Sequence, residues 1–131
     1  MTIYITQGRY TRDAIVGMIV KPEDRADPLA RILSKVGGRL LGYYVTFGEY
    51  DFLSIAEVPN DTQMAAVLLA AGSSGGVTDL KTTVAMTSVE AKGAFAAAEV
   101  MATGLQGAGR DLSTQQRTNG INRRFAALSS T

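Results

Sequence analysis

Residues 37–58, GGRLLGYYVTFGEYDFLSIAEV, decide the fold predicted for this 131-residue chain. Two apolar runs flank the four residues 47–50, which is the pattern of two antiparallel strands joined by a tight turn. The pair Gly37 and Gly38 just before them is typical of the end of a helix. Along the first strand one face is predicted to carry Leu40, Gly42, Tyr44 and Thr46. The opposite face also carries large apolar residues, so we expect both faces of this sheet to be covered.

The segments on either side of this hairpin supply two further strands and two helical regions. Residues 2–10 and 77–86 have the period-two pattern of strands. Thr11 can cap a short helix to about residue 19, whose apolar residues Val16, Ile19 and Val20 we expect to turn inward. A longer helix begins near Asp24 or Asp27. Another helix follows the turn at residues 59–61.

The order strand, helix, strand, strand, helix, strand predicts an α+β fold with ferredoxin-like split βαβ (βαββαβ) topology and an antiparallel sheet. We expect a domain over residues 1–87 and an added C-terminal helix and extended tail over residues 88–131, with the helix at residues 88–103. Two helices cover one face of the sheet. An 87-residue core has no third layer for the other face, so we expect a homo-oligomer, a dimer or higher.

The sequence YYVTFGEYD, with Tyr44, Gly48 and Asp51, resembles the signature of the GYD domain family. The same family resemblance extends over roughly residues 1–90. It includes the opening strand, the pair Gly37 and Gly38, and the last strand. The resemblance implies the dimeric α+β barrel architecture in a small bacterial or archaeal family that is largely uncharacterised. It implies nothing about activity, and the chain after Met86 departs from the family pattern.

Composition excludes several kinds of site. The chain has no Cys, His or Trp, which removes thiol nucleophiles, thiolate metal sites and the commonest general base. The net charge of +1 indicates no nucleic-acid partner. No basic-then-apolar leader and no membrane-spanning run are present in the sequence, so we expect a cytoplasmic protein without a membrane partner. We expect no cofactor and no metal, because the acidic residues lack the spacing of a cation-binding loop.

The candidate pocket residues lie in and around the hairpin and the last strand. They are Tyr44, Thr46, Tyr50, Asp51 and Lys81. A tyrosine phenol bonded to Asp51 can act as a weak acid–base pair in a buried pocket, and Lys81 can neutralise an anion if it points inward. The favoured alternative is turn chemistry: Gly48 adopts a positive φ beside Glu49, Asp51 binds turn amides, and Lys81 is an exposed strand lysine. No residue is assigned a catalytic role.

Three functions remain open. The first is a homo-oligomeric α+β barrel protein with an assembly or small-ligand binding role. The second is a cofactor-independent enzyme, of the monooxygenase or isomerase type, acting on a small aromatic or lactone; this rests on fold analogy alone. The third is an adaptor that docks a protein partner through its C-terminal tail.

The tail places Ile121, Phe125 and Leu128 at i, i+4 and i+7, the spacing of one helical face. An eight-residue helix is too short to hold itself in water, so a docking surface must supply the order. We expect that surface to belong to a neighbouring subunit, with a foreign partner as the alternative.

Deleting residues 104–131 is predicted to give a smaller or weaker oligomer, because each buried apolar side chain of the tail contributes roughly 1.5–3 kcal/mol. Native mass spectrometry and thermal melting check this. An unchanged stoichiometry and melting temperature would contradict docking on another subunit.

Overall fold

The computed structural model describes residues 1–105, so the predicted docking residues Ile121, Phe125 and Leu128 lie outside the described residues. The chain divides into two units, Met1–Met86 and Thr87–Thr131. The sheet and three of the helices belong to the first unit.

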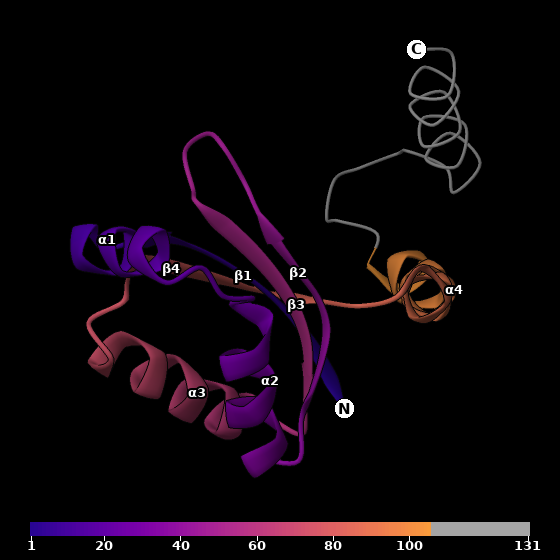
Figure 1. The fold of residues 1–131 in the computed structure, drawn as a ribbon. Coiled ribbons are helices and arrows are strands. Elements are labelled where there is room, and N and C mark those ends of the chain that lie inside the picture. The colour runs from indigo at the N-terminus through magenta and orange to yellow at the C-terminus, as the bar shows by residue number, and fades with distance from the viewer. Residues whose placement is uncertain (106–131) are drawn as a thin grey trace. The chain divides into compact units, whose positions relative to one another are not determined.

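The first unit has the predicted α+β fold with split βαβ topology. Its elements in chain order are β1 (Thr2–Tyr10), α1 (Arg12–Val20), α2 (Ala26–Lys35), β2 (Arg39–Val45), β3 (Phe52–Val58), α3 (Asp61–Ser73) and β4 (Val77–Ala85). The strands form one sheet in the order β2-β3-β1-β4, and every neighbouring pair is antiparallel (Figure 1). The first and third strands of the chain therefore occupy the centre of the sheet.

Helices α2 and α3 both cover one face of this sheet, which we call the helix-covered face (Figure 1). Every second residue of β3 is buried against them, from Phe52 to Val58. The core also contains Tyr4 of β1, Leu33 of α2, and Met64 and Val67 of α3. We call the opposite side of the sheet the open face.

Local sequence signals set the helix ends. The Thr11 hydroxyl accepts from the Ala14 N–H at the start of α1, and the Asn60 side chain accepts from the Gln63 N–H at the start of α3. At the end of α2, Gly37 adopts a φ of 72°, and the Gly38 N–H donates to the Leu33 carbonyl at 2.8 Å. A residue with a β-carbon would be strained at Gly37, which explains why the helix stops there.

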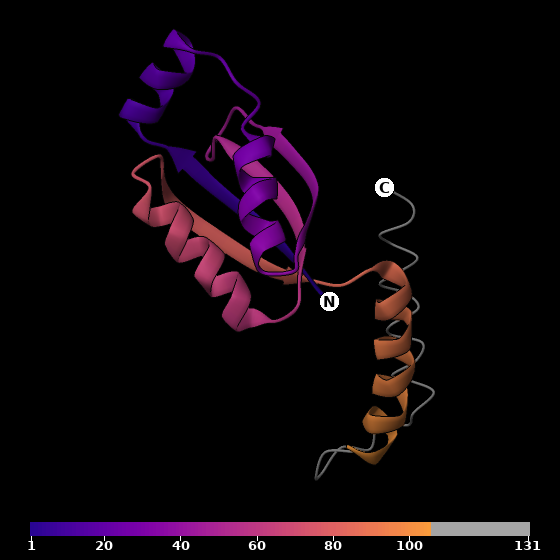
Figure 2. The ribbon, with the colours of Figure 1, turned by 60° about the horizontal axis from the view of Figure 1, so that its bottom comes forward.

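Helix α1 differs from the prediction. It has the expected cap and length, but none of its residues is buried, and Val16, Ile19 and Val20 are exposed. Figure 2 shows α1 projecting beyond the sheet, away from α2 and α3. The apolar residues of α1 therefore do not turn inward, because the core closes between α2, α3 and the sheet without them.

The predicted face assignment of β2 is wrong at Leu40. A register shift between Leu40 and Gly42 adds one residue, so Leu40 pairs with Ala56 on the helix-covered face, whereas Tyr44 pairs with Leu53 on the open face. An extra residue in one strand exchanges the faces of all residues beyond it. Strict alternation, which the sequence alone suggests, cannot detect such a bulge.

The positive φ predicted at Gly48 is also wrong. Among the described glycines only Gly37 and Gly75 have positive φ, and a β-carbon at Gly48 would meet no atom within 4 Å. The turn is closed by side-chain and backbone hydrogen bonds of its flanking residues, so it needs no left-handed residue at this position.

The second unit begins with α4 (Ser88–Gly104), which confirms the helix predicted at residues 88–103. The Thr87 hydroxyl accepts from the Glu90 N–H and also donates to the Glu90 carboxylate, so Thr87 caps the first turn of the helix. Within this unit the described apolar side chains Val89, Phe95, Val100, Met101 and Leu105 are exposed.

Gly38→Ala is predicted to lower the free energy of unfolding by about 1–3 kcal/mol. Its β-carbon would lie 2.8 Å from the Glu57 carbonyl oxygen and 3.2 Å from that of Leu33, so α2 and β3 must separate. Urea denaturation measures the change. Gly48→Ala is the matched control and should change stability by less than about 0.5 kcal/mol, because its β-carbon faces open space. Equal losses in both variants would contradict this account.

Candidate functional site

Hydrogen bonds of Thr46 close the turn between β2 and β3. Its backbone N–H donates to the Asp51 carbonyl at 2.8 Å, and its hydroxyl donates to the Tyr50 carbonyl at 2.7 Å. A threonine here can form both bonds at once, since it carries a donor on the backbone and another on the side chain. Three predicted site residues, Thr46, Tyr50 and Asp51, therefore lie together and build the turn.

Asp51 attaches this turn to the central strand β1. Its backbone N–H donates to the Gly8 carbonyl at 2.8 Å, and its carboxylate accepts from the Tyr10 N–H at 2.9 Å. The partner of the carboxylate is a backbone amide and not a tyrosine hydroxyl. Asp51 therefore binds a backbone amide, as the turn-chemistry interpretation of the sequence predicted. That amide, however, belongs to Tyr10 of β1 and not to the turn.

Arg9 is a second attachment point, which sequence reasoning missed. Its Nε donates to the Glu49 carbonyl at 2.8 Å, and its guanidinium lies over the Tyr50 ring at 5.6 Å from the centroid. The same guanidinium lies 3.7 Å from the Asp79 carboxylate on β4. Asp79 has a φ of 53° next to the register shift between β1 and β4. Arg9 therefore connects the turn to the bulge at the edge of the sheet.

The other two predicted pocket residues, Tyr44 and Lys81, lie on the open face of the sheet and not in the turn. The pairings Tyr44–Leu53, Leu53–Gln7 and Gln7–Lys81 place both residues in one row across the open face. They occupy opposite edge strands, roughly 14 Å apart at a strand spacing of about 4.8 Å. Both side chains are exposed, Tyr44 by 59%. The five predicted pocket residues therefore do not line one common cavity within a single described chain.

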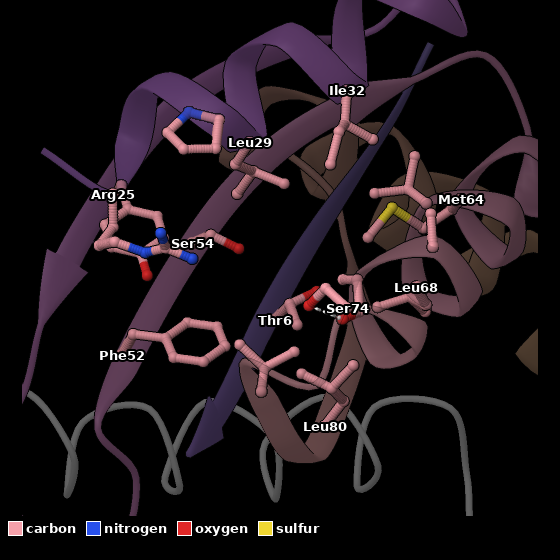
Figure 3. Close-up of a pocket in the computed structure, with 16 residues that line it drawn as sticks. Thr6, Arg25, Leu29, Ile32, Phe52, Ser54, Met64, Leu68, Ser74 and Leu80 are labelled. Carbon is pink, nitrogen blue, oxygen red and sulfur yellow. Dashed lines mark hydrogen bonds between the residues drawn. The ribbon is translucent and has the colours of Figure 1, made fainter. Parts of the chain in front are cut away.

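A cavity of about 180 Å³ lies instead between the helix-covered face and helices α2 and α3 (Figure 3). None of the five predicted pocket residues lines it. Its walls come mainly from apolar side chains of every layer of the first unit: Pro28, Leu29 and Ile32 of α2, Met64, Val67, Leu68, Ala70 and Ala71 of α3, and Tyr43, Phe52, Val77 and Leu80 of the sheet. Its polar residues are Thr6, Arg25, Ser54 and Ser74.

Two rings of a three-ring stack, Tyr43 and Phe52, line the cavity. The Phe52 ring lies between Tyr10, at a centroid distance of 5.2 Å, and Tyr43, at 5.7 Å. The two tyrosine hydroxyls share a hydrogen bond of 2.5 Å. Burial raises the pKa of Tyr43 far above its ordinary value, and its bond to Tyr10 adds to this. Burial also raises the pKa of Tyr10, against the opposite effect of the bond to Tyr43. Both phenols therefore stay protonated at neutral pH and supply no phenolate base.

Ser54 is the polar residue on the cavity wall whose hydroxyl is unused. The side chain is on the helix-covered face of β3, and the residue is only 4% exposed. Its hydroxyl makes no hydrogen bond to another described residue, but it is not sealed off from the cavity. By contrast, the Thr6 hydroxyl pairs with that of Thr82 at 2.9 Å, and the Ser74 hydroxyl donates to the Ala71 carbonyl.

Sequence reasoning missed the residues of this cavity. The available signal was Ser54, a polar residue among the inward positions of β3, where the other three are Phe52, Ala56 and Val58. No pattern in the sequence indicated that Arg25 lines a cavity, because it lies in the charged segment 21–27, which is typical of a solvated loop. Its position beside the sheet depends on how α2 packs.

Residues 1–105 lack the features of two further classes of site. This part of the chain contains no cluster of three or more acidic residues placed to hold a metal ion. None of its helices combines the length and the apolar character needed to cross a membrane.

Comparison with known proteins gives one sequence match and weak structural similarities. Residues 4–95 match the model of the GYD domain. A crystal structure of FFRP-DM1 is 14% identical, with a TM-score of 0.42, and covers 66% of this chain and 100% of its own. The crystal structure of TTHA0845 from Thermus thermophilus is 16% identical, with a TM-score of 0.44, and covers 66% and 95%. No functionally curated protein matches the chain.

Asp51→Ala is predicted to lower the free energy of unfolding by about 1–3 kcal/mol, because the Tyr10 N–H loses its acceptor. Asp51→Asn should lose about 1 kcal/mol or less, since its amide oxygen can still accept from that N–H. Chemical denaturation of the two variants and the wild type measures the difference. An alanine variant as stable as the wild type would contradict the attachment role of Asp51.

Proposed function

This chain belongs to the GYD domain family, and from that premise we propose that it functions as a homo-oligomer whose subunits associate through the open face of the sheet. The observation that supports the proposal is the composition of that face. Its centre is apolar, although α2 and α3 both pack on the other side of the sheet.

The strand pairing defines the apolar centre. Ile5 pairs with Ile55, and the neighbouring rows add Ile3 and Leu53. On the edge strand β2, the Tyr44 ring folds over Gly42, whose β-carbon, if present, would lie 3.1 Å from it. An aromatic ring that is 59% exposed beside four aliphatic side chains makes a contiguous apolar surface. Such a surface marks an association site when polar groups surround it.

The rim of the open face is polar and carries both signs of charge. Glu57 is paired with Arg39 at 2.9 Å at one end, and Lys81 and Gln7 lie in the row at the other. A two-fold axis places the same patch on both partners, so an apolar centre with a mixed rim is complementary to a second copy of itself. This argument favours another GYD chain over a partner of strongly acidic or basic surface.

The two alternative functions gain less support. An acid–base enzyme built on Tyr44, Thr46 and Asp51 would need these groups in one cavity. Tyr44 is exposed on the open face, whereas the side chains of Thr46 and Asp51 are hydrogen-bonded to backbone groups at the turn and on β1. The adaptor hypothesis depends on Ile121, Phe125 and Leu128, which lie outside the described residues.

Ile55→Lys is predicted to convert the oligomer to monomers at micromolar concentration, because two lysines would meet at the centre of the interface without a counter-charge. Light scattering coupled to size-exclusion chromatography measures the mass. Leu69→Lys on α3 is the matched control, since Leu69 is 75% exposed and lies on the opposite side of the molecule. A monomeric wild type, or an Ile55→Lys variant with the wild-type mass and fold, would refute the proposal.

A further inference from the structure

We propose that the cavity between α2, α3 and the helix-covered face binds a small aromatic carboxylate with a single ring, of about the size of benzoate. The site lies within one chain. Its occupancy therefore does not depend on the association of subunits through the open face.

The size of the cavity is sufficient for a single ring. A dry cavity of about 150 Å³ lined by aliphatic and aromatic side chains is large enough for benzene. The cavity here, about 180 Å³, leaves room for one small substituent beyond the ring. Its body is apolar, with Leu29 and Ile32 from α2 and Leu68 from α3 (Figure 3).

Ser54 is the first observation that points to a polar group on the ligand. Figure 3 shows its side chain directed into the cavity from β3. Its hydroxyl is open to the cavity and makes no hydrogen bond to another described residue, whereas the hydroxyls of Thr6 and Ser74 are paired. A hydroxyl donates readily to a carboxylate oxygen, so Ser54 can anchor the substituent of the ring.

Arg25 is the second observation and gives the charge of that group. Its side chain lines the same cavity and remains 29% exposed. One of its terminal nitrogens contacts the Glu23 carboxylate at 2.6 Å. A guanidinium has five N–H donors, so others remain available, and their planar arrangement fits a carboxylate.

Arg25 lies at the same end of the cavity as Phe52 (Figure 3). Its positive charge opposes the rise in the pKa of both Tyr10 and Tyr43, the outer members of the stack with Phe52. In Figure 3, Arg25, Ser54 and Phe52 are drawn at one end of the cavity, and Met64 and Leu68 at the other. A carboxylate at the Arg25 and Ser54 end leaves its ring among the apolar side chains.

The test is isothermal titration of the full-length protein with benzoate, together with benzyl alcohol and acetate as probes. We expect saturable binding of one benzoate per chain. Benzyl alcohol lacks the charge and acetate lacks the ring, so each should bind at least about tenfold more weakly. No saturable benzoate binding in the millimolar range would overturn the proposal. Equal affinity for benzoate and benzyl alcohol would overturn the assignment of a carboxylate.

Variants locate the site. Ala71→Leu fills the cavity and should abolish binding, whereas Ala66→Leu, on an exposed position of the same helix, should leave it unchanged. Arg25→Gln should weaken benzoate about tenfold or more and benzyl alcohol little. Benzoate binding retained in a folded Ala71→Leu variant would refute the location.

Amide chemical shifts of the wild type provide a measurement that does not depend on the folding of any variant. Benzoate should shift the backbone amides of Ser54, Leu68 and Val77, which line the cavity on three different elements. Shifts confined to the open face, around Tyr44 and Lys81, would refute the site even if benzoate binds.

Discussion

The alternating burial of β3 is the constraint on which the rest of the first unit depends. Its even-numbered residues, from Phe52 to Val58, are buried against α2 and α3, and Leu53 and Ile55 between them point to the open face. Because side chains alternate along a strand, a slip of one residue would exchange the two sets. The register must therefore be held at both ends. Asp51 holds one end through the Gly8 carbonyl and the Tyr10 N–H, and the close approach of Gly38 to Glu57 holds the other.

The alternating burial along β3 gives the two faces of the sheet different physical characters. The helix-covered face is closed by α2 and α3, but small residues such as Ala71 leave a cavity beside the stacked rings. The open face is a nearly continuous apolar surface with charges only at its rim. Assembly and ligand binding would therefore use opposite sides of one strand. A ligand in the cavity would not have to leave when subunits associate.

The GYD turn has a structural role in this arrangement. Thr46, Asp51 and Arg9 use their polar atoms on backbone carbonyls and amides, which fixes the hairpin on β1. Groups committed to such bonds are poor candidates for chemistry, because moving them breaks the register of the central strands. The side chains with unused hydrogen-bonding capacity, Ser54 and Arg25, lie on the cavity wall. The most recognisable motif of the sequence and the proposed binding site are therefore different parts of the molecule.

Features that arise from neighbouring residues can be predicted from the sequence alone. These are the order of the elements, the cap at Thr11, the helix end at Gly37, and α4, because each depends on a few adjacent side chains and backbone groups. The bulge beside Leu40, the exposure of α1 and the cavity arise only in the folded chain. Each of these depends on how segments far apart in the chain fit together. Arg25, Ser54 and Leu68 meet at one cavity because two helices pack on β3, and no local pattern in the sequence records that packing.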